Sequence, residues 1–158
     1  MRAVPQFGER EPGRDYPDRP AAFALILQDG MIAVVQVESR RRGRVIDLPG
    51  GGVDPGESAA QAVMRECGEE AGLVVEVGAE PFARADLYFV NDDGWAHNSR
   101  GQFFVASVAA EDPSLKVEDD HTLLWISPQA ALTALDRDAH AWAVAAWMRS
   151  LERARSNG

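Results

Sequence analysis

The chain has 158 residues, 46% of them hydrophobic, with 16 basic and 25 acidic residues and a formal net charge of −9. This length and composition fit one globular domain with its own core, and the acidic balance argues against a protein that binds nucleic-acid polymers. The single cysteine, Cys67, excludes an intrachain disulfide. Because no apolar run is long enough to cross a membrane and no leader pattern is visible, we expect a soluble, cytoplasmic protein.

The N-terminal stretch, residues 1–19, is polar and contains three prolines and two glycines without any periodicity. We interpret it as an extended arm and place the folded domain at residues 20–155. Residues 21–27 and 31–37 are apolar and β-prone, and the Asp-Gly dipeptide between them is typical of a tight hairpin turn.

A basic loop, residues 38–44, follows this hairpin and precedes a short strand at 45–48. An arginine-rich hairpin tip is commonly solvated, but guanidinium groups also fork onto phosphate oxygens. The loop lies close in sequence to the acidic helix described next. We therefore take Arg44, the arginine nearest the strand, as a candidate substrate-binding residue.

Three glycines at positions 50–52 and a Pro-Gly turn lead into a helix. Ser58 and Gln61 have the spacing of a capping box, in which each side chain bonds the other's backbone. Gly72 is a typical residue just past a helix end. These signals predict a helix over residues 59–71.

One arc of this helix gathers three carboxylates, Glu66, Glu69 and Glu70, beside Arg65. Each like-charge pair on an exposed helix costs roughly 0.2–0.5 kcal/mol, and Arg65 offsets only part of that. A solvated acidic face is the ordinary interpretation. The alternative is a site for a hard divalent cation, which takes oxygen ligands and which a backbone carbonyl of the glycine run could also reach.

The same stretch resembles a complete Nudix box, the signature of the Nudix hydrolases. The pattern is Gly51, five residues, Glu57, seven residues, and then the continuous segment 65–73. All of its fixed glycine, glutamate and arginine positions are filled, and the signature spans 23 residues without a gap. The resemblance implies a Nudix-fold α/β/α sandwich and hydrolysis of a P–O–P bond in a nucleoside diphosphate linked to another group.

The resemblance also implies a role for each residue of the box. The metal, Mg²⁺ with Mn²⁺ as a substitute, would be held by the Gly50 carbonyl, Glu66, Glu69 and Glu70. Glu66 either binds the metal or accepts the proton of the attacking water. Arg65 and Glu57 would orient the metal-binding carboxylates.

Beyond the box, apolar patterning predicts strands at 74–77, 83–90, 102–108 and 123–126. Tyr88 lies near the position past the box where a tyrosine in this family suggests dinucleoside polyphosphates. A proline there suggests ADP-ribose, but Pro81 comes too early. We therefore count Tyr88 as a candidate substrate residue and lean away from ADP-ribose.

Residues 91–101 are rich in turn-forming residues and predict a polar loop. Its Trp95 could stack on a nucleobase, with Asn98 and Arg100 supplying hydrogen bonds, although an ordinary hairpin loop fits the pattern equally well. His97 is expected in solvent, since no second histidine or cysteine stands at ligand spacing.

An acidic segment, residues 116–121, precedes the strand at 123–126. In Nudix hydrolases an acidic residue of this region often adds a metal ligand or acts as general base. We favour Glu118 over Asp119 and Asp120 for that role, with a charged turn as the alternative. Two helices then follow, at 128–135 and from Asp138 onward.

The order of elements predicts an α/β protein with a mixed central sheet and helices on both faces. The expected activity is Mg²⁺-dependent cleavage of a nucleoside triphosphate, a dinucleoside polyphosphate or a nucleotide sugar. Two alternatives remain: removal of pyrophosphate from an RNA 5′ end, and a binding module that senses a nucleotide without cleaving it. The expected partner is a small nucleotide, without a membrane or a nucleic-acid polymer, and a homodimer is left open.

Overall fold

A computed structural model describes residues 3–158 of the protein. The strands are β1 (Gln6–Phe7), β2 (Asp18–Gln28), β3 (Met31–Ser39), β4 (Gly43–Asp47), β5 (Gly50–Gly52), β6 (Leu73–Val77), β7 (Ala83–Val90), β8 (Ala96–Glu111) and β9 (His121–Ile126). The helices are α1 (Ala59–Ala71), the short 3₁₀ turn η1 (Pro113–Leu115), α2 (Pro128–Ala134) and α3 (Asp138–Ser156). No helix in this part of the chain is long and apolar enough to span a membrane.

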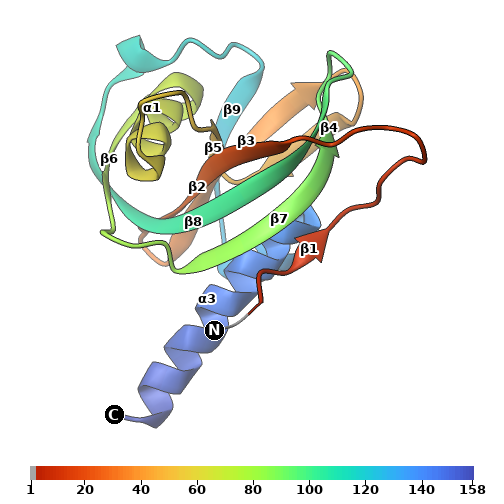
Figure 1. The fold of residues 1–158 in the computed structure, drawn as a ribbon. Coiled ribbons are helices and arrows are strands. Elements are labelled where there is room, and N and C mark those ends of the chain that lie inside the picture. Colours follow the sequence, from red (N-terminus) through yellow and green to blue (C-terminus); the bar gives the residue numbers. More distant parts are fainter. Residues whose placement is uncertain (1–2) are drawn as a thin grey trace.

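The strands form one mixed sheet in the order β1-β7-β8-β2-β3-β4 (Figure 1). The long strand β8 pairs in parallel with β2 and antiparallel with β7 and β6. The glycine strand β5 runs antiparallel to the start of β2, with Gly52 opposite Ala21 and Gly50 opposite Phe23. Strand β2 therefore holds β5 in a fixed position.

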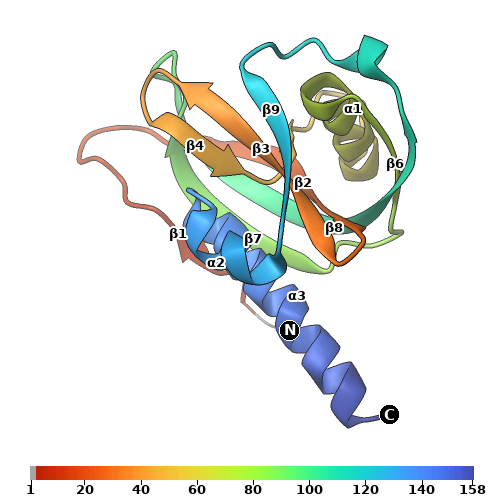
Figure 2. The ribbon, with the colours of Figure 1, turned by 180° about the vertical axis from the view of Figure 1, so that it is seen from behind.

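Helices cover both faces of the sheet, as predicted: α1 lies on one side and α2 and α3 on the other (Figures 1 and 2). On the α1 side, Val63 and Cys67 pack against small residues of β2 such as Ala22 and Ala24. The opposite cluster joins aromatic residues of the sheet to the first turns of α3, while the C-terminal turns of α3 extend away from the sheet. The alternation of side chains along β2 separates these two cores.

The predicted helix signals are confirmed. Ser58 and Gln61 form the reciprocal capping box, and Gly72 ends α1 with φ 67° in the left-handed conformation. Glycine adopts this conformation without the steric cost that a Cβ would bring. Helix α1 consequently has the bounds expected from the sequence.

One region differs from the sequence-based expectation. Strand β8 begins at Ala96, so most of the segment 91–101 that was expected to form a loop is strand paired with β7. Its polar side chains are tolerated because acidic neighbours satisfy them, as Asp18 does for Asn98 at 3.1 Å. His97 is therefore buried, with only 4% of its surface exposed, rather than solvated.

The N-terminal segment extends along the domain. Strand β1 pairs in parallel with β7, bringing Gln6 opposite Asp86. Phe7 lies 6.0 Å from the ring of Trp142 on α3, and Tyr16 lies edge-on to Tyr88 at 5.3 Å. These contacts anchor the segment to both the sheet and α3.

Candidate active site

One guanidinium group organises the acidic arc of α1. Arg65 contacts Glu57 at 2.9 Å through two nitrogens, Glu66 at 3.0 Å and Glu69 at 3.2 Å. Its Nη2 also donates to the carbonyl of Gly52 at 3.1 Å. A planar guanidinium can bridge several acceptors at once, so Arg65 draws the carboxylates of the box toward the glycine strand.

Glu57 is held firmly in its ionised form. The hydrogen bonds from Arg65 lower the pKa of Glu57 to about 2, and the backbone N–H of Asp54 contributes a further bond. The turn before α1 is thereby tied to the middle of the helix.

Glu70 occupies a different environment, since only 3% of its surface is exposed. Its Oε1 accepts a hydrogen bond from the Gly50 N–H at 3.1 Å. Burial, and then the neighbouring charge of Glu66, raise the pKa of Glu70 well above its ordinary value. An ionised Glu70 therefore requires a nearby cation, because Arg65 contacts the other carboxylates and not this one.

The glycine strand leaves room for these carboxylates. A Cβ at Gly51 would lie 2.7 Å from Oε1 of Glu66. Carboxylate and backbone carbonyl oxygens are the donor atoms that Mg²⁺ and Mn²⁺ prefer. The donor chemistry of Glu66, Glu69 and Glu70 thus suits a hard divalent cation, and their role as its ligands, with a carbonyl of β5, stays a prediction.

A second acidic segment, residues 116–121, lies against the C-terminal end of α1. The carbonyl of Glu69 accepts hydrogen bonds from the N–H groups of Val117 and Glu118, at 2.9 and 3.0 Å. His121 lies between Asp120, at 2.8 Å, and Glu70, at 3.6 Å. Potential ligand atoms of Glu118, Asp120 and His121 lie within 4.8 Å of one another. The structure therefore brings the predicted segment 116–121 to the box helix.

A buried polar group lies directly before the glycine strand. Asp47, only 5% exposed, contacts Arg42 at 3.0 Å and Arg137 at 3.4 Å. Burial raises the pKa of Asp47, but Arg137 and Arg42 outweigh burial and hold it below its ordinary value. His140 accepts a hydrogen bond from the Leu48 N–H at 3.1 Å. These contacts fasten the start of α3 to the strand that leads into the site.

Four of the predicted substrate residues already have protein partners. Arg44 is exposed and pairs with Glu38 at 2.7 Å, on the β3–β4 hairpin. Arg100 pairs with acidic residues of β2 and β7, and Asn98 bonds Asp18 and Gln6. Tyr88 packs against Tyr16 of the N-terminal segment. Their role in binding a substrate stays a prediction.

Trp95 is the fifth predicted substrate residue, and 43% of its surface is exposed. It follows a turn in which the Asn91 N–H bonds the Trp95 carbonyl at 2.9 Å. Its ring stacks on buried His97, with centroids 4.7 Å apart. The guanidinium of Arg19, which borders the glycine strand at Gly52, lies 5.4 Å from the Trp95 ring centre. Trp95 therefore contacts Arg19, which in turn borders the glycine strand.

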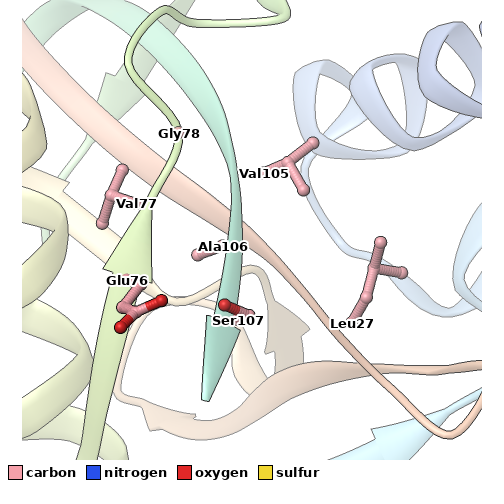
Figure 3. A pocket seen from close by; sticks show the side chains of 7 residues that line it. All are labelled: Leu27, Glu76, Val77, Gly78, Val105, Ala106 and Ser107. Carbon is pink, nitrogen blue, oxygen red and sulfur yellow. The ribbon is translucent and has the colours of Figure 1, made fainter. Parts of the chain in front are cut away.

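An open hollow is formed by residues of β2 and β8 and by the end of β6 (Figure 3). It has a volume of about 310 Å³ and is lined by Leu27, Glu76, Val77, Gly78, Val105, Ala106 and Ser107. These residues belong to the far end of β2 and to β6 and β8, so the hollow does not include the box. The acidic arc remains the place where chemistry-bearing side chains gather.

A family model described as the NUDIX domain matches residues 17–148 of the chain. The chain belongs to the Nudix family. Curated relatives that carry this domain are named as a diphosphatase and as a pyrophosphohydrolase. The predicted resemblance is thus confirmed, and the Nudix box is the acidic arc described above.

Individual Nudix relatives give narrower likenesses. An RNA pyrophosphohydrolase from Sphingopyxis alaskensis is 29% identical over 117 residues, which are 66% of this chain and 72% of the relative. A Bacillus subtilis protein named as an 8-oxo-dGTP diphosphatase is 39% identical over 59 residues, 37% of this chain and 38% of that protein. The solved structure of a MutT protein from Methanosarcina mazei Go1 superposes with a TM-score of 0.69 at 23% identity, covering 87% of this chain and 98% of that one. Two curated relatives are matched over only 38% of their own length.

Sequence reasoning missed three residues that the structure places near α1 and the glycine strand. His121 was only the end of an acidic segment, and Arg137 stood between two predicted helices. Arg19 was assigned to the arm because nothing in its neighbourhood carries a motif. The pairing of β9 with β3 places His121, the packing of α3 places Arg137 beside Asp47, and the pairing of β5 with β2 places Arg19 beside Gly52. All three depend on contacts between distant segments, so the sequence contained no local signal for them.

Proposed function

We propose that this Nudix hydrolase cleaves a P–O–P bond of a small nucleotide with Mg²⁺ or Mn²⁺ held by Glu66, Glu69 and Glu70. The buried carboxylate of Glu70 carries the proposal. It lies beside Glu66, forms no ion pair with an arginine among residues 3–158 and has a raised pKa, so a cation is needed to make an ionised Glu70 stable there. When bound, a divalent cation neutralises charge on the phosphates and lowers the pKa of a coordinated water.

Other residues of the chain position the carboxylates or accept a proton. Arg65 fixes the positions of Glu66 and Glu69 through its hydrogen bonds, while Glu57 fixes Arg65. The Gly50 N–H orients Glu70. Glu66 and Glu118 are the two candidates for accepting the proton of the attacking water, since both belong to groups that meet at the C-terminal half of α1.

Nucleoside triphosphates come first among the proposed substrates, because a relative is named as a diphosphatase of 8-oxo-dGTP. Dinucleoside polyphosphates and nucleotide sugars follow. The test is product release from such a panel with Mg²⁺, with Mn²⁺ and with a chelator. We expect turnover of at least one nucleotide that the chelator abolishes, and metal-independent turnover would contradict the proposal.

A second candidate is hydrolysis of the 5′ triphosphate of RNA. The RNA pyrophosphohydrolase relative, matched over 72% of its length, favours it. The net charge of −9 opposes a long polymer groove, but a 5′ end needs only a short one. Comparing kcat/KM for a triphosphorylated oligonucleotide and for the free mononucleotide decides between the two candidates.

A further inference from the structure

Two arginines meet the same glycine of β5 from different elements. Arg65 reaches the Gly52 carbonyl from α1. Arg19, at the start of β2, lies so close that a Cβ on Gly52 would be 2.4 Å from its Nη2. By the alternation of β2, Arg19 shares a face with Ala21 and Phe23, on the α3 side of the sheet, whereas α1 covers the other side. The glycine strand thus stands between the carboxylates and a second guanidinium group.

Arg19 differs from the other arginines around the site in its bonding. Arg42, Arg65 and Arg100 each contact two or more carboxylates. Arg19 forms neither an ion pair nor a side-chain hydrogen bond with any residue of the described range 3–158, although its surface is partly buried. A guanidinium offers five N–H donors, and leaving them unmatched in a partly buried place costs free energy.

The contact with Trp95 fixes Arg19 without using those donors. Its guanidinium carbon lies 5.4 Å from the ring centre, within range of a cation–π attraction. Trp95 is itself held by His97 beneath the ring and by the turn at residues 91–95. Arg14 strengthens this turn by donating to the Gly94 carbonyl. The result is an oriented cation whose N–H groups are available to an anion next to the box.

We infer that Arg19 binds a phosphate of the substrate that the box carboxylates do not hold, and that Trp95 positions its guanidinium. The inference rests on the proposed function, because the anion is a phosphate of the nucleotide bound at the box. A guanidinium forks onto two phosphate oxygens, so the pair Arg19–Trp95 recognises phosphate rather than the base. This assigns to Trp95 a positioning role in place of the predicted stacking on a nucleobase.

The test is a titration of the full-length protein with Mg²⁺ and two probes, inorganic pyrophosphate and the non-hydrolysable analogue α,β-methylene-dGTP. Arg19→Ala should raise the Kd of both probes roughly tenfold or more, as expected for the loss of charge-assisted hydrogen bonds. Arg19→Lys should recover part of the affinity, since a lysine supplies charge without the fork. With a hydrolysed substrate, KM should rise while kcat changes less than threefold.

Two further variants separate binding from structure. Arg149→Ala, which removes the same charge from the exposed face of α3, should leave Kd unchanged. Trp95→Phe should keep the affinity within about threefold of wild type, whereas Trp95→Ala should lose most of what Arg19→Ala loses. Thermal melting of each variant checks that the fold is retained.

The outcomes distinguish this inference from the proposed function. If wild type binds the probes and Arg19→Ala binds them equally well, the inference is overturned and the proposed function stands. If wild type binds neither probe with Mg²⁺, both are overturned. Equal losses in Trp95→Phe and Trp95→Ala would overturn the positioning role of Trp95 alone.

Discussion

Arg65 and Glu70 show how like charges can be packed along one helix face. The guanidinium nitrogens of Arg65 lie within 3.2 Å of carboxylate oxygens of Glu57, Glu66 and Glu69. The repulsion expected among these carboxylates is therefore largely neutralised. Among residues 3–158, Glu70, turned inward, receives only the Gly50 N–H and a longer contact from His121. A negative charge on Glu70 would therefore be the unmatched one, next to the glycine strand.

At this scale we predict that Glu69→Gln and Glu70→Gln each lower kcat by two or more orders of magnitude. Glutamine keeps the volume but loses the charge that a divalent cation requires. Glu70→Gln also removes a buried carboxylate with a raised pKa, so the melting temperature of the metal-free protein should not fall. Glu76→Gln, an exposed residue of β6, serves as the matched control. Near-normal turnover in both box variants would reject the assignment.

Among the elements, β5 decides how closely backbone and carboxylate approach. Gly50 has φ 144°, and a Cβ there would lie 2.2 Å from the Ala22 carbonyl oxygen. At Gly51 φ is not positive, and the nearest atoms to a Cβ belong to the Glu66 side chain. Adjacent glycines therefore serve different purposes, one for the fold and one for the site.

This difference predicts opposite behaviour for two alanine substitutions. Gly51→Ala should fold with a melting temperature close to wild type but lose at least tenfold in kcat, because Glu66 must move away from its present position. Gly50→Ala should be strongly destabilised, since backbone atoms of β2 cannot yield and a positive φ is strained for alanine. Melting curves and kcat measured on the same samples check both, and a stable, active Gly50→Ala would contradict the account.

Elements with a local signal could be predicted, and contacts that depend on register could not. Ser58, Gln61 and Gly72 define α1 through bonds only a few residues apart, so the sequence alone identifies its bounds. The start of β8 was misplaced because polar residues such as Asn98 read as loop until a paired strand supplies their partners. Arg19 likewise becomes recognisable only once β5 is paired with β2.

At the scale of the whole molecule, the site rests on the junction between β4 and α3. Asp47, Arg42 and Arg137 form a buried ionic group there, and Arg137 lies 4.1 Å from the ring centre of Phe89. His140, 1% exposed, bonds the backbone just before the glycine strand. Helix α3, on one face of the sheet, thus holds in place the segment that leads into β5, and β5 lies beside α1 on the other face.

The buried histidine makes stability depend on pH. Burial, and then the charge of Arg137, lower the pKa of His140 to about 3, against about 6.5 in an unfolded chain. Between these values the unfolded state binds the extra proton. His140 therefore contributes its full stability above pH 6.5, and this is lost as the pH falls, by about 1.4 kcal/mol per pH unit for that proton.

His140→Gln should remove this contribution, because glutamine does not titrate and its carbonyl can still accept the Leu48 N–H. Urea unfolding at pH 7 and pH 5 measures the difference in free energy of unfolding for both proteins. We expect the variant to lose less stability between the two pH values than wild type. Buried His97, whose pKa is lowered to about 4, contributes a pH dependence in both proteins. Identical pH dependence would contradict a neutral, buried His140.

The measurement that tests the central claim most directly is Mn²⁺ binding by electron paramagnetic resonance, without nucleotide. It compares wild type with the variant in which Glu66, Glu69 and Glu70 are all glutamine. We predict a bound Mn²⁺ in wild type and at least a tenfold loss of affinity in the triple variant. Equal Mn²⁺ affinity in the two proteins would show that the carboxylates of α1 are not the metal site.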